Sequence, residues 1–406
     1  MKKIVYSAIK GKHETFGYYA LLSVFGLILA AALASAWYME HNGHYVTAMN
    51  NQIVWGMPHV FAIFLIVAAS GALNVASIGS VFGKVDYKPL GRLSSLLAIA
   101  LLIGGLAVLV LDLGRPDRLI IAMFNNNFTS IFAWNIFLYV GFIIIVAAYL
   151  WVQMERKVNH LQSKAGLIAL VWRLSLTTGT GSIFGFLVAR EAYDSAVMAP
   201  LFIVMSFSFG LAFFSLVLMA SYKTTNRELG DIIINRLGKL LGLFAAAVLY
   251  FTAVQHLTNL YAAEHTGVER FILVDGGIFT LLFWLGQVVI GGIIPMAITL
   301  TKKTLTSSKL AIASLLVIIG GFAQVYVIVI GGQAWPLTLF PGMEVTSVIG
   351  DGAIASYSAT LPEIALGLGG FAIAGIMVLI GVRVMRFLPK SLANSMIDPY
   401  YQVKEN

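Results

Sequence analysis

The sequence predicts an all-α polytopic membrane protein that crosses a bilayer ten times. Of its 406 residues, 59% are hydrophobic and only 11% are charged, whereas about 25% of the residues of a water-soluble domain are charged. Apolar runs of roughly 20 residues recur along the whole chain, and each is long enough to cross about 30 Å of hydrocarbon. The short alternating segments that build a membrane β-barrel do not occur in the sequence.

Ten apolar runs account for the chain in order, and charged residues resume at one or both ends of each run. The expected spans are 16–39, 53–82, 93–113, 131–153, 166–189, 199–221, 239–262, 273–299, 309–332 and 362–388. Among the connections only 333–361 is long, so we expect a single integral membrane domain over 1–406 without a sizeable soluble part.

The distribution of Lys and Arg predicts how the spans are oriented. The side that holds both termini carries 21 of the 26 basic residues, and the other side carries four, namely Arg115, Arg118, Arg190 and Arg270. Because basic residues accumulate on the cytoplasmic side, we expect both termini in the cytoplasm and the chain in the cytoplasmic membrane of a bacterium or archaeon. The net charge of +8 is therefore a topology signal and does not imply a nucleic-acid partner.

The residues that the chain lacks narrow its chemistry. It contains no Cys, so it cannot ligate an iron–sulfur cluster through thiolates, attach a haem covalently or form a disulfide. It has no Gly-rich phosphate loop followed by Lys, which argues against an ATPase. No Ser/His/Asp arrangement and no HExxH motif stands out.

Polar side chains from neighbouring spans are expected in one layer near the outer face. His59 lies about six residues inside the second span, a depth of about 9 Å at the helical rise. Asn135 and Tyr139 are four residues apart and therefore share one face of the fourth span. Asp112 ends the third span at a similar level. Ionisable groups inside a bilayer are costly, which makes this layer a candidate functional site.

This layer suits the head group of a quinone. A quinol that gives up its protons needs hydrogen-bond partners for two oxygens, a titratable acceptor, flat apolar walls and a path to water. His59 titrates near neutral pH, Asn135 and Tyr139 can fix an oxygen, and Asp112 can pass protons outward. The alternative is structural: His59 bonds a backbone carbonyl, and the Trp and Tyr residues form the usual interfacial belt.

The stretch LDLGRPDR at 111–118 ends the third span with four charges. As a structural element, its Gly and Pro stop the helix and its two Arg pair with its two Asp. As a functional element, it is the rim of the site and a docking edge for an outer partner. The two interpretations are compatible. The residues expected to support the site are Trp55, Arg115, Trp134, Arg190 and Glu191.

These motifs resemble the polysulfide-reductase membrane-subunit family (NrfD/PsrC-like). LDLGRPDR followed by NFTSIFAWNIF is fairly specific, and VWGMPH, FWLGQVVIGGIIP and VYVIVIGGQ extend the resemblance over most of the chain. The ten-span form most resembles the DsrP-type subunit of the DsrMKJOP complex. This resemblance implies two four-helix bundles, spans 2–5 at 53–189 and spans 6–9 at 199–332, with spans 1 and 10 as flanking helices.

The resemblance implies a subunit of a respiratory redox complex that is not catalytic alone and holds no haem or iron–sulfur cluster. It would exchange electrons between the menaquinone or ubiquinone pool and a periplasmic ferredoxin-like iron–sulfur subunit, in dissimilatory sulfur metabolism. A multihaem cytochrome c and other membrane subunits would complete the complex. Carried onto this chain, the quinone-binding residues are His59, Asp112, Asn135 and Tyr139.

Polar residues elsewhere in the spans leave alternatives open. Gln255, His256 and Asn259 near the outer end of the seventh span form either a degenerate second site or hydrogen bonds between helices. Arg173 in the fifth span either belongs to a proton path or extends to the cytoplasmic interface, as long cationic side chains often do.

Two other classes of protein fit part of the pattern. A b-type cytochrome needs two axial His ligands, and His59 and His256 lie at matching depths. A secondary transporter would explain ten spans and the Gly-rich stretch TTGTGSIFG. Its polar groups would usually lie near the midplane, whereas these lie near one face.

The outer face is expected to bind the iron–sulfur partner. Its net charge is −7 against +14 on the inner face, and it offers two sizeable loops, 112–130 and 333–361. The second loop contains Trp335, Pro336, Pro341 and Met343, which would be exposed if it projects into water. Exposed apolar residues rimmed by polar ones commonly mark a protein contact.

Overall fold

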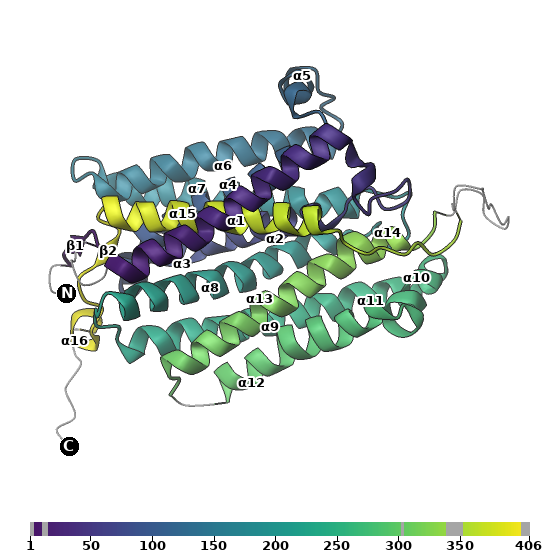
Figure 1. The fold of residues 1–406 in the computed structure, drawn as a ribbon. Helices are drawn as coiled ribbons and strands as arrows, with labels where there is room; N and C mark the ends of the chain where they lie inside the picture. Colours follow the sequence, from purple (N-terminus) through teal and green to yellow (C-terminus); the bar gives the residue numbers. More distant parts are fainter. Residues whose placement is uncertain (1–3, 10–14, 302–303, 338–351, 399–406) are drawn as a thin grey trace.

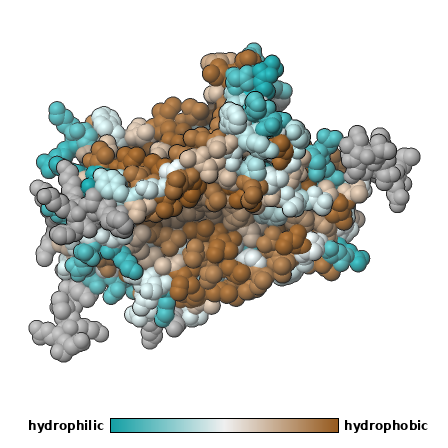
Figure 2. Space-filling model, viewed as in Figure 1, coloured by the Kyte–Doolittle hydropathy of each residue, from teal (hydrophilic) through white to brown (hydrophobic). Residues whose placement is uncertain are grey.

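The computed structural model describes residues 4–9, 15–301, 304–337 and 352–398. Most of these residues form long helices that lie side by side (Figure 1). Among these residues, ten helices are long and apolar enough to cross a membrane. The predicted all-α polytopic fold is therefore confirmed. Figure 2 shows hydrophobic side chains over the middle of the visible face and hydrophilic ones towards both ends, as a bilayer requires.

The long helices follow the order of the predicted spans. They are α1 (Thr15–Asn42), α2 (Met57–Ala72) continued by α3 (Asn74–Ser80), α4 (Gly91–Leu111), α6 (Ile131–Met154), α7 (Gln162–Gly185), α8 (Met198–Thr224), α9 (Asp231–Tyr261), α11 (Ile278–Leu281) continued by η7 (Leu282–Ile293) and α12 (Ile294–Leu300), α13 (Ser307–Tyr326) continued by η8 (Val327–Gly331) and α14 (Gly332–Ala334), and α15 (Leu361–Val384).

Shorter elements connect these helices. They are the strands β1 (Tyr6–Ser7) and β2 (Leu388–Pro389) and the helices η1 (His44–Val46), η2 (Val85–Leu90), η3 (Pro116–Arg118), α5 (Leu119–Phe124), η4 (Asn159–Leu161), η5 (Ala263–His265), α10 (Thr266–Arg270), η6 (Phe271–Asp275) and α16 (Asn394–Ile397). Three of the elements, η6, η7 and η8, are π-helical.

From α2 to α13, long helices that are neighbours along the chain pack against each other, and α2 also packs on α8. We call α2, α4, α6 and α7 the first bundle, and α8, α9, the helix η7–α12 and α13 the second bundle. Helices α1 and α15 pack against each other, and α15 also lies against α2 and α4, so both flanking helices cover the first bundle (Figure 1). The bundles meet mainly where α2 crosses α8.

Glycines allow α2 and α8 to approach closely at this crossing. A Cβ on Gly71 would overlap the backbone carbonyl of Ser206, and a Cβ on Gly210 would overlap the backbone of Gly71 and Ala72. Small residues at helix crossings let backbones come into van der Waals contact, which is a main source of helix association in membranes. The contact therefore joins the two bundles into one packed unit.

The two terminal segments of the described chain meet at one end of the molecule. Tyr6 pairs with Pro389 and Ser7 with Leu388 in the antiparallel ladder β1–β2, and the Lys390 amide donates to the carbonyl of Val5. We call this the terminal end. Helices α5, α10 and α14 lie at the opposite end (Figure 1).

Some helix boundaries differ from the predicted spans because hydropathy does not report turns. The second span was expected from 53, but α2 begins at Met57 with Pro58 in its first turn, where proline is well tolerated. The eighth span was expected from 273, but η6 extends to Asp275, and Gly277, with φ 56°, then turns the chain into α11, which begins at Ile278. The fifth span was expected to reach 189, whereas α7 ends at Gly185.

Candidate functional site

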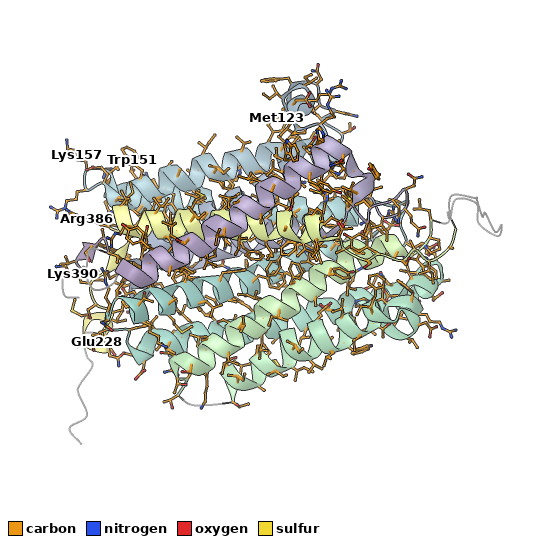
Figure 3. The ribbon with its side chains drawn as sticks, viewed as in Figure 1. Met123, Trp151, Lys157, Glu228, Arg386 and Lys390 are labelled. Atoms are coloured by element: carbon orange, nitrogen blue, oxygen red, sulfur yellow. The ribbon has the colours of Figure 1, made fainter. Side chains whose placement is uncertain are left out.

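His59 and Asp112 come together at the end of α4 that leads into α5, whose Met123 is labelled in Figure 3. His59 lies in the first turn of α2, and Asp112 caps the C-terminus of α4. The His59 Nδ1 atom lies 2.8 Å from Asp112 Oδ2, with the Asp112 side chain fully buried and the His59 side chain 17% exposed. The approach lacks the angles of a hydrogen bond, so Nδ1 and both carboxylate oxygens have no hydrogen-bond partner among the described residues.

Asn135 and Tyr139 project from α6 towards α7, as their shared face predicts. The Asn135 amide nitrogen donates to the carbonyls of Ile131 at 2.9 Å and Gly179 at 3.0 Å. Its Oδ1 atom is buried without a partner among the described residues. The hydroxyl of Tyr139 lies 3.3 Å from Thr180 Oγ1. One face of α6 is therefore fixed to α7, and one amide oxygen remains unused.

Trp55 packs on His59 and on aromatic side chains of α6 and α7. Its ring stacks on His59 with the ring centroids 6.2 Å apart, and it contacts Phe132 at 6.2 Å and Phe184 at 5.8 Å. Phe132 precedes Asn135 by about one turn of α6. The indole therefore contacts residues near the start of α2 and near the start of α6.

Gln333 holds Trp55 in place, a role that the sequence did not predict. Its Oε1 accepts hydrogen bonds from the amides of Val54 and Trp55, both at 3.0 Å, and its Nε2 donates to the Trp55 carbonyl at 2.9 Å. Arg190 donates to the carbonyls of Gln52 at 2.7 Å and Gln333 at 3.3 Å, and partial burial lowers its pKa. The side-chain amide of Gln333 therefore joins two sequence motifs, VWGMPH and VYVIVIGGQ. Gln333 is the last residue of the second motif, and this polar residue at the end of an apolar run was the signal that could have indicated its role.

Glu191 and Trp134 were also expected to support the site, and the contacts that define their positions are with other parts of the chain. Glu191 Oε2 accepts a hydrogen bond from Trp335 Nε1 at 2.9 Å, and the Glu191 carbonyl accepts one from His265 Nδ1 at 2.7 Å. Trp134 is half exposed and donates to the Phe128 carbonyl at 2.8 Å. The expectation that Trp335 is uncovered is wrong, because it also packs on Phe271.

Pro336, which follows Trp335, is half-buried, and the other two apolar residues of that loop, Pro341 and Met343, lie outside the described residues.

The charged stretch at 111–118 separates into a buried and an exposed part. Arg115 binds Asp117 through two hydrogen bonds, of 3.0 Å and 2.9 Å, with side chains 62% and 60% exposed. This pairing raises the pKa of Arg115 and lowers that of Asp117. The expected pairing of Asp112 with an Arg is wrong, because Gly114, at φ 67°, turns the chain away after α4 and leaves Asp112 facing His59.

A second imidazole lies beside that turn. A Cβ on Gly114 would be 3.4 Å from Nε2 and Cδ2 of His44, and this Nε2 atom is buried without a hydrogen-bond partner in the described part of the chain. The sequence did not single out His44, because it lies in a loop between spans. It is close to the chain segment that follows Asp112, on the outward side of the site.

A buried acid also fixes the start of α2. Glu363 Oε1 accepts a hydrogen bond from the Tyr357 hydroxyl at 2.6 Å, and that hydroxyl accepts one from the Met57 amide at 2.6 Å. Burial and the Glu363 carboxylate raise the pKa of Tyr357. Thr360 and Glu363 form a capping box at the start of α15, for which the sequence TLPE before an apolar run was the signal.

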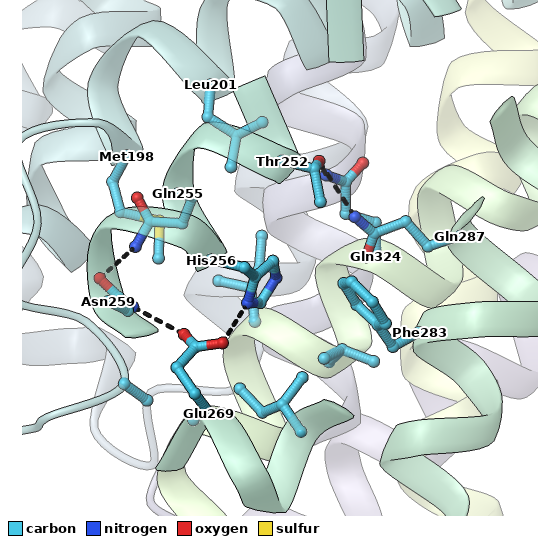
Figure 4. A pocket seen from close by; sticks show the side chains of 15 residues that line it. Met198, Leu201, Thr252, Gln255, His256, Asn259, Glu269, Phe283, Gln287 and Gln324 are labelled. Carbon is cyan, nitrogen blue, oxygen red and sulfur yellow. Dashed lines mark hydrogen bonds and ion pairs between the residues drawn. The ribbon is translucent and has the colours of Figure 1, made fainter. Parts of the chain in front are cut away.

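The polar residues of the second bundle bind a buried acid of their own. His256 Nδ1 lies 2.6 Å from Glu269 Oε2, and Asn259 Nδ2 donates to Glu269 Oε1 at 2.8 Å (Figure 4). His256 and Glu269 line a cavity here. The site at His59 is instead inferred from buried polar atoms that have no hydrogen-bond partner among the described residues. His59 and His256 belong to different bundles, and each is paired with its own carboxylate. This pairing does not favour two axial ligands to one haem.

Arg173 is buried within the membrane-spanning part and does not extend to the interface. Its side chain lies over the Phe207 ring at 5.2 Å, and its Nε and Nη1 atoms have no hydrogen-bond partner among the described residues. The expectation of an interfacial Arg is therefore wrong; α7 directs this side chain at α8, which carries Phe207.

Comparisons with known proteins agree along most of the chain. Residues 45–336 match the family described as Polysulphide reductase, NrfD. The Hdr-like menaquinol oxidoreductase integral membrane subunit of Archaeoglobus fulgidus is 30% identical over 396 residues, covering 95% of this chain and 97% of that protein. A selenate reductase subunit of Mesobacillus selenatarsenatis is 24% identical over 412 residues, covering 92% and 93%. Protein NrfD of Escherichia coli is 25% identical over 277 residues, covering 60% and 83%.

Proposed function

The chain belongs to the polysulphide reductase NrfD family, and on that premise we propose that it is the membrane subunit of a respiratory complex that oxidises menaquinol at His59 and Asp112. The relative from Archaeoglobus fulgidus is named as a subunit of a menaquinol oxidoreductase, which supports menaquinol over ubiquinol. The DsrP-type assignment, and with it the proposed link to dissimilatory sulfur metabolism, comes from the resemblance of the ten-span form.

A set of buried polar atoms without hydrogen-bond partners among the described residues carries this proposal. Among those residues, Oδ1 of Asp112 and Oδ1 of Asn135 have no hydrogen-bond partner, and Asp112 Oδ2 and His59 Nδ1 lie 2.8 Å apart as an ion pair without hydrogen-bond geometry. Buried polar atoms in native proteins are almost always hydrogen-bonded, so a ligand is expected to bind here. Carboxylate and amide oxygens only accept hydrogen bonds. The ligand must therefore donate, which the two hydroxyls of a quinol do and the two carbonyls of a quinone do not.

The residues of the site divide the work of quinol oxidation, which releases two electrons and two protons. Asn135 Oδ1 accepts a hydrogen bond from one hydroxyl and orients the ring, and Trp55 provides an apolar wall. The pair of His59 and Asp112 accepts both protons one after the other, passing on the first before it takes the second, since an imidazole beside a carboxylate is a favourable base. His44, beside the turn after Asp112, is the next proton acceptor on the way to the surface.

The electrons leave through a partner protein at the opposite end. The chain has no Cys, so thiolate-bound iron–sulfur clusters must belong to another subunit, proposed to be periplasmic and ferredoxin-like. The exposed Arg115–Asp117 pair is a proposed contact for it. Arg115→Glu should reduce co-purification of the partner more than Lys223→Glu at the terminal end, and equal retention would contradict this docking face.

Binding and turnover measurements on the purified complex test the quinol site. His59→Gln and Asn135→Leu should each weaken binding of a fluorescent hydroxyquinoline N-oxide, a quinol analogue, and lower the rate of menaquinol oxidation, with normal membrane assembly. His160→Gln is the matched control, because His160 is exposed in η4 at the terminal end. Wild-type binding and turnover in both site variants would refute the assignment.

A further inference from the structure

The cavity beside His256 and Glu269 is lined by many polar side chains (Figure 4). We propose that it is a hydrated proton-binding site, in which His256 and Glu269 together hold one exchangeable proton and ordered water transfers it. This site is separate from the quinol site and does not depend on it. The polar side chains that line the cavity are Thr252, Gln255, His256, Asn259, Glu269, Gln287 and Gln324.

The Glu269 carboxylate is fixed through both of its oxygens. One lies 2.6 Å from His256 Nδ1, and the other accepts a hydrogen bond from Asn259 at 2.8 Å. Gln255 extends the chain, since it donates to Asn259 at 3.5 Å and accepts from Ser195 at 2.8 Å. The Glu269 side chain is only 1% exposed. A net charge is costly in such surroundings, so the pair is favoured when it shares a single proton and is neutral overall.

The geometry leaves the other ring nitrogen of His256 for exchange with the cavity. Because Nδ1 is engaged by Glu269, Nε2 has no hydrogen-bond partner among the described residues, and the ring lies beside Phe283 with centroids 4.7 Å apart. Gln287 and Gln324 both donate to Thr252 Oγ1, at 3.1 Å and 3.3 Å. Their carbonyl oxygens therefore remain as acceptors, and a water molecule needs two to four such polar partners.

The size of the cavity identifies the ligand as water. Its volume of about 30 Å³ holds one or two molecules, since a water needs at least roughly 10–15 Å³. Pockets for drug-sized ligands start at about 300 Å³, so a quinol ring does not fit. Apolar side chains complete the lining and separate the water from lipid; they are Met198, Leu201, Ile272, Val327 and Ile328.

The backbone supports a functional role for this place. The three π-helical segments η6, η7 and η8 each contribute lining residues. Well under 1% of residues in globular proteins are π-helical, and π-turns occur frequently at functional sites. Three of them lie around this one small cavity, and Gln287 of η7 is among its polar lining residues.

The remaining charged groups near the pair point elsewhere. Arg270 pairs with the exposed Asp275 at 2.6 Å. Glu264 is 76% exposed and lies 3.8 Å from His265, which bonds the Glu191 carbonyl. The lining residues from α8, η7 and α13 include no titratable side chain. His256 and Glu269 are thus the titratable unit of the described lining.

Infrared difference spectroscopy of the full-length protein in lipid nanodiscs tests the proposal. Spectra recorded between two pH values should show carboxyl and imidazole bands that shift in D₂O and a water O–H band that shifts in H₂¹⁸O. The carboxyl band should disappear in Glu269→Gln, and the imidazole band in His256→Gln. Glu264→Gln, a matched exposed acid, should leave both unchanged.

A further variant keeps the test independent of the charged pair. Thr252→Val removes only the hydroxyl that holds the two amides, so it should shift the water band and retain the carboxyl band. A wild-type spectrum without an exchangeable carboxyl band, or an unchanged band in Glu269→Gln, would overturn the proposal. A water band that is lost on adding a quinol analogue would identify the cavity as a ligand pocket and overturn it as well.

Discussion

Replacing Asp112 by Asn should weaken quinol binding without weakening the fold. The substitution keeps the shape of the side chain but removes the charge and one of the two acceptor oxygens. In the structure those oxygens have no hydrogen-bond partner among the described residues and the side chain is fully buried. The carboxylate therefore contributes no hydrogen bond to the ligand-free protein, and its proposed role is to accept one from the quinol.

The magnitude follows from the kind of hydrogen bond that is lost. A hydrogen bond to a charged group contributes about 1.5–3 kcal/mol, which corresponds to a Kd about 10- to 150-fold higher, since about 1.4 kcal/mol is a factor of ten. The ligand-free protein should be about as stable as the wild type, because the Asn amide keeps one oxygen that can face His59 Nδ1, 2.8 Å from the carboxylate, and removes a buried charge that is costly to desolvate.

Two measurements on the same purified variant separate these effects. Fluorescence titration with the quinol analogue gives the Kd, and thermal unfolding in the same nanodiscs without ligand gives Tm. We expect a raised Kd with little change in Tm. A Tm several degrees below that of the wild type would show that the carboxylate is structural. An unchanged Kd would refute the reasoning that the unpartnered oxygens bind the ligand.

Three other expectations concern packing, support of the site and topology. Gly71→Ala should destabilise the protein by about 1–3 kcal/mol in thermal unfolding, because the new methyl group meets backbone, whereas Gly26→Ala, with open space around it, should not. Gln333→Leu should raise the Kd of the quinol analogue and cost about 1–3 kcal/mol for each buried group left unpaired; an unchanged Kd would contradict its role in holding Trp55. In intact cells, a maleimide that does not cross the membrane should label Phe124→Cys and not Val5→Cys, and the reverse would overturn the predicted orientation.

Local composition accounts for the parts of the structure that the sequence predicted well. In the described part of the chain the ten apolar runs form ten long helices, because length and hydropathy are properties of each segment alone. The four-residue spacing of Asn135 and Tyr139 placed both on the face of α6 that contacts α7. The Gly and Pro of LDLGRPDR also predicted the end of the helix after Asp112, and in the structure Gly114 adopts the positive φ of that turn.

Partners between helices were not predictable in this way. The charges around Asp112 indicated an Arg, but the structure selects His59, a residue that is 53 positions away in the sequence. The roles of Gln333, His44 and Glu363 likewise depend on segments distant in the sequence, such as the contact of η8 and α14 with the start of α2. Hydropathy contains no information about which helix faces which.

The sequence by itself determined that this protein is a ten-span helical membrane protein of a redox-subunit family, with a charge bias that predicts its orientation. Those properties add up residue by residue along the chain. Only the tertiary structure decided that His59 faces Asp112 and that His256 faces Glu269. The reason is physical: a side chain's partner is set by the rotation and crossing of whole helices, which the packing of glycines such as Gly71 and Gly210 fixes.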